Sequence, residues 1–210
     1  MTTMKYDDIL HPALHIDGWM SHAELDWLYE QALKCHSIVE IGSWCGRSTY
    51  ALLSGCKGTV YAIDHFNGSP DELKPGLSHY RALTDDIYSE FMNNVGHFPN
   101  LQVIRGDSVE AAARFPDNSI DMVFIDGCHA YESVKADLAA WGPKTSFLCG
   151  HDRHEGGVPV ALDECIYHID QTIGSLWVAN GLKPPGPGPA KIDVTIDLPG
   201  LIFGTDGGLQ

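Results

Sequence analysis

The stretch Ile38–Thr49, IVEIGSWCGRST, is the most informative part of the chain because an apolar run leads directly into a glycine-containing turn. The apolar residues predict a buried strand over 37–41, and Gly42 and Gly46 predict a turn that begins a helix. Glycine lets the backbone approach a ligand closely, and a helix N-terminus offers unpaired N–H groups. Glu40 precedes the turn in the pattern E-x-G-x-x-x-G, where a carboxylate would repel a phosphate. The stretch therefore predicts a site for a nucleotide-like cofactor with ribose hydroxyls and a cationic amino-acid tail.

The composition is that of an acidic globular chain. Its 210 residues suffice for one α/β domain. We expect a single domain over 1–210, with a helical cap over 1–36 and a loop and strand region over 180–210. The formal net charge is -15 and no run is rich in Lys or Arg, which argues against nucleic acid or an anionic membrane surface as partner.

Three further features of the sequence bear on its environment. No apolar run approaches the roughly 20 residues of a membrane helix. The first residues, MTTMKYDDIL, contain acidic side chains and no apolar segment, unlike a signal peptide, so a cytoplasmic location is expected. The 6 cysteines are scattered and never form C-x-x-C, which favours reduced core thiols over a zinc or redox site.

Strand and helix patterns alternate along the chain. Apolar strands are predicted over 37–41, 59–64, 101–107, 120–126 and 145–150. Six helices are expected. The first begins at the capping box of Ser21 and Glu24, the second follows the glycine turn, and the third covers 79–95. The fourth follows residue 107, the fifth has Val134, Leu138 and Trp141 on one face, and the sixth covers 158–172. Residues 66–78 form a long loop, and 175–180 and 191–198 suggest a terminal antiparallel pair. This order predicts an α/β fold: a doubly wound, mainly parallel, Rossmann-like seven-stranded sheet with helices on both faces.

Acidic residues stand at or just after the carboxyl ends of five predicted strands. In doubly wound sheets, ligands bind outside these ends, so the acids are expected on one rim. Capping of the following helix accounts for some of them singly but poorly for all together. They are Glu40, Asp64, Asp107, Asp126 and Asp152.

Several longer motifs follow in a fixed order: VEIGSWCGRST, YAIDHF, IRGDSVE, IDMVFIDGCHAYESVKADLAAW, GHD and GVPVALDE. Over about 38–165, they resemble the class I S-adenosylmethionine-dependent methyltransferases. The later motifs resemble one branch, which contains small O-methyltransferases of sugars and macrolides and cephalosporin-hydroxylase-like proteins. The resemblance implies methyl transfer from S-adenosylmethionine to a small hydroxylated metabolite or sugar.

The resemblance also implies cofactor contacts. Asp64 would bind the ribose hydroxyls, and Asp107 and Ser108 would lie near the adenine. The carboxylates of Glu40 and Asp126 would attract the sulfonium and ammonium groups. The expected cofactor-binding residues are Glu40, Gly42, Ser43, Gly46, Ser48, Asp64, His65, Asp107, Ser108 and Asp126.

A divalent metal, such as Mg or Mn, is a second implied group. Related O-methyltransferases hold one with an acid after the fourth strand and two residues after the fifth, here Asp126, His151 and Asp152. Histidine with two aspartates suits Mn, Fe or Zn better than Mg. Alternatively, His151 acts as a general base without a metal. His129, in the sequence H-x-Y-E, is a base, a ligand or a packing residue at a helix start. The candidate catalytic residues are His129, His151 and Asp126.

Two other functions fit parts of the sequence. A nicotinamide-dependent oxidoreductase fits the spacing of Glu40 and Asp64, but the turn lacks the G-x-G-x-x-G fingerprint. A non-catalytic cofactor-binding domain would keep the pocket without the chemistry. In either methyltransferase or oxidoreductase, the partner is a small-molecule substrate. The acceptor, the methylated atom and the oligomeric state, including a homo-oligomer, stay open at this stage.

Overall fold

The computed structural model describes residues 9–77 and 79–184. Within them, a seven-stranded sheet has the order β3-β2-β1-β4-β5-β7-β6. Strands β1 to β5 are parallel, whereas β7 runs antiparallel to both β5 and β6. This sheet confirms the predicted mainly parallel, seven-stranded fold. The strands are β1 (Ser37–Ile41), β2 (Thr59–Asp64), β3 (Leu101–Arg105), β4 (Met122–Ile125), β5 (Leu148–Gly150), β6 (Ile166–Gln171) and β7 (Trp177–Leu182).

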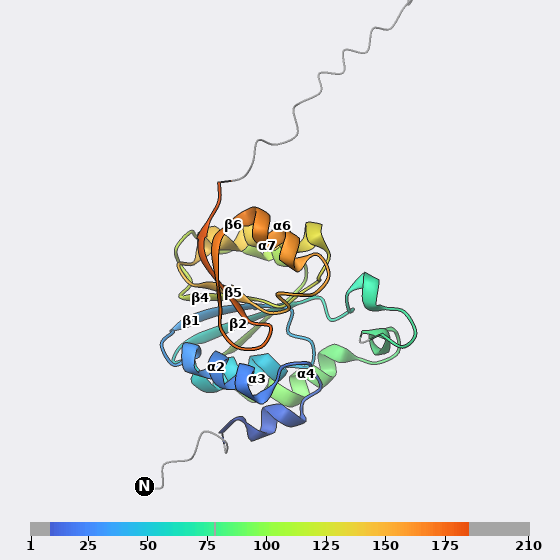
Figure 1. Cartoon of the computed structure of the whole chain (residues 1–210). Coiled ribbons are helices and arrows are strands. Elements are labelled where there is room, and N and C mark those ends of the chain that lie inside the picture. The colour runs from blue at the N-terminus through green and yellow to red at the C-terminus, as the bar shows by residue number, and fades with distance from the viewer. Residues whose placement is uncertain (1–8, 78, 185–210) are drawn as a thin grey trace, which may run out of the picture.

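Helices cover both faces of the sheet. In Figure 1, α2, α3 and α4 lie below the strands, and α6 and α7 lie above them. Short 3₁₀ segments occur at His11–His15, Pro70–Glu72, Tyr80–Leu83 and Gly142–Lys144. The α-helices are α2 (His22–Ala32), α3 (Arg47–Gly55), α4 (Ile87–Val95), α5 (Ser108–Ala112), α6 (Tyr131–Trp141) and α7 (Val158–Cys165).

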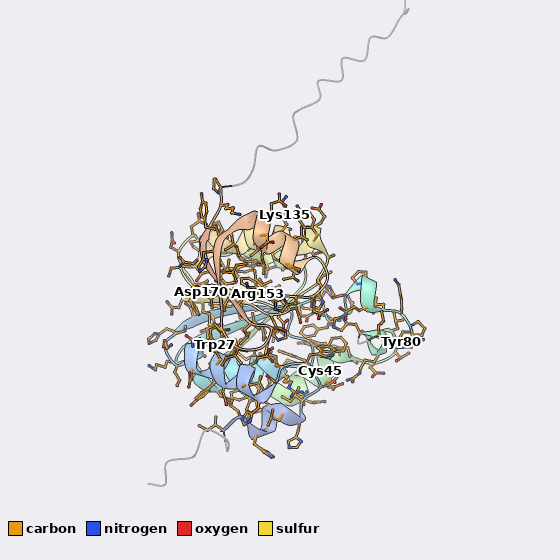
Figure 2. All side chains as sticks on the ribbon, viewed as in Figure 1. Trp27, Cys45, Tyr80, Lys135, Arg153 and Asp170 are labelled. Carbon is orange, nitrogen blue, oxygen red and sulfur yellow. The ribbon has the colours of Figure 1, made fainter. Side chains whose placement is uncertain are left out.

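Alternating strand residues form two separate cores, one under each helix layer. In β1, Ile38 packs in the core beneath α2 and α3, whereas Val39 packs in the core beneath α6. In β4, Phe124 and Val123 divide between the same two cores. Successive strand side chains point to opposite faces, so a strand buried on both faces is apolar throughout. Figure 2 shows the side chains that fill the two layers between sheet and helices.

Two predicted elements differ from the structure. The helix predicted over 158–172 is wrong beyond residue 165, because Ile166–Gln171 form β6 and pair with β7. The branched and aromatic residues of this segment suit a sheet, and the pairing decides the outcome. The antiparallel pair therefore consists of β6 and β7, while the predicted strand over 191–198 lies outside the described residues.

The helix predicted over 79–95 is interrupted. A 3₁₀ turn covers Tyr80–Leu83, and α4 begins only at Ile87. The side chain of Asp86 caps α4 by accepting a hydrogen bond from the Ser89 N–H. This N-cap starts a new helix in the middle of the predicted one. The segment before it projects to one side of the sheet, where Figure 2 labels Tyr80.

None of the helices in the described part of the chain is long and apolar enough to cross a membrane.

Candidate functional site

A cleft of about 850 Å³ lies at the carboxyl ends of the parallel strands. The strand order reverses between β1 and β4, and this switch point is where doubly wound sheets bind ligands. Most of the residues predicted for the site line this cleft, whereas Glu40 and Gly46 do not. The predicted residues in its wall are Gly42, Ser43, Ser48, Asp64, His65, Asp107, Ser108, Asp126, His129, His151 and Asp152.

The first wall is the glycine turn after β1. Gly42 has a φ of 83°, and a Cβ built there would lie 2.1 Å from the carbonyl oxygen of Asp126. Glycine is therefore required for the turn to pass against the end of β4. Gly46 has a φ of 96° and caps α3 in the left-handed conformation, packed against α4 rather than facing the cleft.

Asp64, at the end of β2, holds this turn in place. Its Oδ2 accepts hydrogen bonds from the N–H groups of Ser43 and Trp44, both at 2.9 Å. Its Oδ1 accepts a hydrogen bond from the Phe66 N–H at 2.6 Å. A carboxylate offers about four lone-pair directions, so Asp64 retains capacity for a further donor at the cleft wall.

Glu40 lies beneath the turn and is fully buried. Its carboxylate accepts hydrogen bonds from the hydroxyls of Ser43, Ser48 and Thr49, at 2.8, 2.6 and 2.5 Å. Burial raises the pKa of Glu40 to about 7, although the three hydroxyl hydrogen bonds oppose this shift. In this structure Glu40 braces the turn from below, so its predicted direct attraction for a cationic cofactor tail stays a prediction.

A second wall, next to the turn, brings two aspartates and a histidine together. Among the described residues, Asp126, His129 and Asp152 form a group whose ligand atoms all lie within 4.8 Å of one another. His129 Nε2 lies 2.8 Å from Asp152 Oδ2. Side chains of these types at this separation are suited to binding a divalent cation.

The sequence predicted His151 as the histidine ligand of the metal. In the structure, His151 is buried between Glu24 and Asp152 and is not part of the group formed by Asp126, His129 and Asp152. Its Nε2 lies 3.0 Å from Glu24 Oε1, and its Nδ1 lies 3.1 Å from Asp152 Oδ1. The ring is only 7% exposed, behind Asp152. His129 therefore occupies the ligand position in the group that the geometry assembles, while His151 connects that group to α2. The binding roles of both histidines stay predictions.

The charges on this wall are unevenly balanced. Burial raises the pKa of Asp126 to about 7, against the favourable charge of His151. Burial also opposes ionisation of Asp152, but hydrogen bonds from His129 and His151 lower its pKa well below the usual range. Burial disfavours protonation of His151, yet the hydrogen bond to Asp152 and the carboxylates of Asp126 and Glu24 raise its pKa to about 9. Burial and the carboxylates of Asp152 and Glu40 thus disfavour ionisation of Asp126, whereas the imidazoles of His151 and His129 favour it.

A third part of the wall follows β2 and β3. His65 is exposed beside Asp64, and Asp107 caps α5 by accepting a hydrogen bond from the Glu110 N–H at 2.9 Å. The Ser108 hydroxyl hydrogen-bonds to Asp137 of α6. Burial raises the pKa of Asp137 to about 6, despite the hydrogen bond from Ser108. Asp137 lines the cleft and was not predicted.

An aromatic cluster that the sequence analysis did not identify stands over the turn. The ring of His79 lies 4.6 Å from that of Trp44 and 5.2 Å from that of Trp19, measured between centroids. Trp44 belongs to the glycine turn itself. No periodicity marks Trp19 or His79, because they reach the cleft from loops. Because Trp19, Trp44 and His79 are far apart in the sequence, no local pattern predicts that their rings lie close together.

Backbone strain is concentrated at the same rim. Four non-glycine residues in the described ranges have positive φ, and three of them follow β1, β2 and β5 directly or closely: Trp44 (46°), Phe66 (61°) and Asp152 (56°). Such conformations cost of order 1–3 kcal/mol each and gather at functional sites. At Asp152 this conformation accompanies contacts with both His129 and His151.

Comparisons with known proteins identify the family. Residues 39–152 match the family model described as a methyltransferase domain. An uncharacterized protein, y4gI, of Sinorhizobium fredii is 31% identical over 135 residues, which are 61% of this chain. The chain spans only 14% of the length of that relative.

Solved structures share the fold at low sequence identity. An O-methyltransferase from Bacillus cereus in complex with SAH has a TM-score of 0.57 and 17% identity, with 85% of this chain and 94% of that one covered. Cofactor-bound Rv0187 from MTB has a TM-score of 0.57 and 16% identity, with 85% and 92% covered. The O-methyltransferase NovP has a TM-score of 0.54 and 17% identity, with 72% and 78% covered.

The family match spans the glycine turn, Asp64 and the group formed by Asp126, His129 and Asp152. It favours a methyltransferase over the nicotinamide-dependent oxidoreductase that the spacing of Glu40 and Asp64 left open. The chain therefore belongs to the methyltransferase-domain family, the class I S-adenosylmethionine-dependent methyltransferases that its motifs resemble.

Proposed function

We propose that this domain transfers a methyl group from S-adenosylmethionine to a hydroxyl oxygen of a small hydroxylated acceptor such as a sugar, with the help of a divalent cation. One observation carries the proposal. A single cleft has the glycine turn and Asp64 on one wall and Asp126, His129 and Asp152 on the other. The first wall suits the cofactor and the second suits activation of the acceptor.

The cofactor wall offers the required recognition groups. Asp64 accepts hydrogen bonds and retains capacity for a ribose hydroxyl, a common partner of an acidic residue at this place in such folds. Gly42 lets the turn pass directly against the end of β4, where a side chain would collide with the Asp126 carbonyl. Asp107 and Ser108 line the cleft beyond β3, where the adenine would lie.

Methyl transfer to a hydroxyl forms a C–O bond as the S–C bond of the sulfonium breaks, and the hydroxyl proton must leave. His129 lines the cleft, and its imidazole lies between Glu72 and Asp152. When a cation is bound, His129 would be one of its ligands and the proton of the activated hydroxyl would leave to water; without a cation, the neutral His129 ring would accept that proton, although the hydrogen bond to Asp152 raises the pKa of His129. Asp152 hydrogen-bonds to the ring and thereby fixes its orientation. The acceptor must also be held in line with the methyl group, and such positioning contributes several kcal/mol.

The donor set supports a cation. Two carboxylates and one imidazole suit Mn, Fe or Zn better than Mg. Burial raises the pKa of Asp126 to about 7, and a divalent ion beside it would favour its ionised form. A divalent ion bound there would supply Lewis-acid activation of the acceptor hydroxyl. The residues that would hold it are Asp126, His129 and Asp152.

The carboxylates around the cleft argue against a polyanionic acceptor, and the neighbours support oxygen as the methylated atom. Carboxylates of Asp17, Glu72 and Glu155 also line the cleft, and the chain has a formal net charge of -15. These charges would repel a polyanion. Two of the solved structures with this fold are described as O-methyltransferases, which supports oxygen as the methylated atom.

Isothermal titration with S-adenosylhomocysteine, with and without Mn²⁺ or Mg²⁺, tests the proposal first. We expect micromolar affinity for the wild type and weaker binding for Asp64→Ala. Unchanged affinity in Asp64→Ala would remove Asp64 from the cofactor site, and no binding by the wild type would contradict the proposed function.

The metal component requires a separate comparison. Sugar and phenol acceptors are screened for methylation with Mn²⁺, with Mg²⁺ and with a chelator, using the wild type and Asp152→Ala. We expect activity that depends on a divalent ion in the wild type and is lost in the variant. Methylation that is independent of metal in both proteins would leave His129 as a general base and exclude the ion. Cofactor binding without methylation of any acceptor would favour the non-catalytic alternative.

A further inference from the structure

The segment between β2 and α4 brings a carboxylate to the wall of the cleft formed by Asp126, His129 and Asp152. This wall is called the acceptor wall below. In Figure 1 this segment projects to the side of the sheet, in teal and green, before the chain returns through α4. Glu72 lies on it, at the end of the Pro70–Glu72 turn. Its Oε1 lies 3.2 Å from Nδ1 of His129, which follows β4. Residues 57 positions apart in the sequence therefore meet in the cleft.

The segment holds Glu72 in a defined position. The Glu72 N–H donates to the Ser69 carbonyl at 2.9 Å, and Ser69 is buried. Gly68 has a φ of 71°, and a Cβ built there would lie 2.9 Å from His79 Cβ and 3.0 Å from Leu73 Cδ2. Glycine is thus required for the segment to fold back on itself. Glu72 belongs to a packed turn rather than to an extended loop.

Two histidines, His79 and His129, lie close to Glu72, and the contacts of His79 limit which of them is able to donate a hydrogen bond to it. His79 Nδ1 lies 3.3 Å from Glu72 Oε2, but the same nitrogen accepts a hydrogen bond from the Ser69 N–H at 3.1 Å. A ring nitrogen that accepts carries no proton, so His79 Nδ1 does not donate to Glu72. Burial lowers the pKa of His79, which agrees with a neutral ring. Of these two histidines, His129 is therefore the one whose Nδ1 is able to donate a hydrogen bond to Glu72, at a distance of 3.2 Å.

The position of the His129 backbone is set independently of its ring. Its carbonyl accepts a hydrogen bond from the Gly157 N–H at 2.7 Å. The ring then has a carboxylate on each side, with Glu72 at Nδ1 and Asp152 at Nε2. Histidines that bind metals or act as bases commonly donate their second ring nitrogen to a carboxylate, which fixes tautomer and orientation.

We propose that Glu72 is a positioning residue, which accepts a hydrogen bond from His129 Nδ1–H and so presents His129 Nε2 to the group formed with Asp126 and Asp152. This inference rests on the proposed function for its catalytic meaning, but the hydrogen bond can be tested without activity. The acceptor wall is then complete only when the segment carrying Glu72 is folded against β4. The segment after β2 is therefore part of the active site and not merely a connection.

The orientation is tested by ¹⁵N NMR of the full chain labelled at histidine, with the His129 signals assigned by their loss in His129→Gln. We expect the wild-type Nδ1 nitrogen of His129 to have the shift of a protonated nitrogen. Glu72→Ala should change that shift, whereas Glu72→Gln, which retains an accepting oxygen, should largely preserve it. An unprotonated Nδ1 in the wild type, or an identical shift in Glu72→Ala, would overturn the proposal.

Manganese affinity, measured by titration without an acceptor, tests the consequence. Loss of a carboxylate that orients a metal-binding histidine typically weakens metal affinity by about 10- to 100-fold, and we expect this for Glu72→Ala. Glu72→Gln should weaken the manganese affinity less than Glu72→Ala does. Glu155→Gln is the matched control, since Glu155 also lines the cleft but its change should alter the affinity by no more than about twofold. Equal losses in Glu72→Gln and Glu155→Gln, with none further in Glu72→Ala, would show only a general charge effect and overturn the positioning role.

Parallel titrations with S-adenosylhomocysteine separate this inference from the proposed function. All the Glu72 variants should retain micromolar affinity for it, because Asp64, the expected ribose ligand, is held by the N–H groups of Ser43, Trp44 and Phe66 and not by Glu72. If the wild type fails to bind S-adenosylhomocysteine, the proposed function fails while the NMR result still decides the role of Glu72. If the wild type binds no Mn²⁺, the cation is excluded and the NMR comparison again decides the orientation of His129.

Discussion

At the scale of single residues, the carboxylates of the site stabilise the fold itself through hydrogen bonds, with no ligand present. Asp64 holds the glycine turn through two backbone N–H groups. Glu40 gathers three hydroxyls in the core beneath it. A buried carboxylate is tolerated only where hydrogen bonds satisfy it. The acids at the strand ends therefore shape the cleft wall, and Glu40 does so from beneath the turn without lining the cleft.

Glu40 should make stability depend on pH. Burial raises its pKa from 4.5 to about 7 in the folded protein, while in the unfolded chain the group ionises near 4.5. The folded state therefore binds more protons between these values, so its free energy of unfolding falls as pH rises through this window. The contribution of Glu40 is fully present below about pH 4.5 and is lost above about pH 7, by a few kcal/mol.

Urea unfolding of the wild type and Glu40→Gln across this window measures the effect. Glutamine keeps hydrogen-bonding capacity for the three hydroxyls but does not titrate. The difference in free energy of unfolding between the two proteins should therefore change in favour of the variant as pH rises. Two parallel curves would show that Glu40 ionises normally in the folded protein.

At the scale of elements, the turn between β1 and α3 is packed against the end of β4. This contact brings the cofactor wall and the acceptor wall into one cleft, because Asp126 directly follows β4. The N–H of Asp126 donates to the Ile41 carbonyl at 2.8 Å, and the N–H of Gly42 donates to the Ile63 carbonyl at 3.0 Å. The ends of three strands are thereby held in register.

Gly42→Ala should disrupt this arrangement. Its Cβ would lie 2.1 Å from the Asp126 carbonyl oxygen, so backbone must move as well as adopt a strained φ. We expect a loss on the order of 3 kcal/mol in the free energy of unfolding, and weaker S-adenosylhomocysteine binding.

Gly76→Ala is the matched control for this change. Gly76 has a similar φ of 87°, but nothing lies within 4 Å of its Cβ position. Only the strain of a left-handed alanine remains, at about 1 kcal/mol. Equal losses in the two variants, measured by urea unfolding, would show that φ rather than the contact with β4 makes glycine necessary at position 42.

At the scale of the whole molecule, Glu24 joins three distant parts of the chain. It completes the capping box of α2 by accepting from the Ser21 N–H and hydroxyl, at 2.8 and 2.7 Å. Its other oxygen lies 3.0 Å from His151 Nε2 and accepts from the Ser175 N–H at 2.9 Å. The N-terminal helix, the end of β5 and the turn before β7 thus meet at one buried carboxylate.

Removal of the Glu24 carboxylate should strongly lower the free energy of unfolding. Glu24→Ala would leave His151 and the Ser175 N–H without their partner in the interior, and such losses cost about 3–5 kcal/mol. Glu24→Gln, which keeps an accepting oxygen, should lose less. Glu30→Ala on the exposed side of α2 is the control and should change stability by no more than about 0.5 kcal/mol. Urea unfolding that gives similar values for Glu24→Ala and Glu30→Ala would contradict a structural role for the Glu24–His151 pair.

The sequence alone determined the features that local physics controls. Apolar runs predicted the strands, and β1 and β2 begin and end where the pattern placed them. The capping box of Ser21 and Glu24 began a helix as expected. The alternation of strands and helices indicated a parallel sheet, and that topology brought acids from successive strand ends to one rim. Each of these signals lies within a few residues of the structure that it specifies.

The tertiary structure decided what depends on residues far apart in the chain. Periodicity could not show that Ile166–Gln171 pair with β7 instead of continuing α7, because the pairing supplies the stabilisation. Nor could it show that Glu24 meets His151, or that Glu72 meets His129. For that reason the choice between two histidines for the acceptor wall stayed open in the sequence. Contacts of this kind arise only when the sheet and its loops have folded, since side-chain distances across a cleft leave no local pattern.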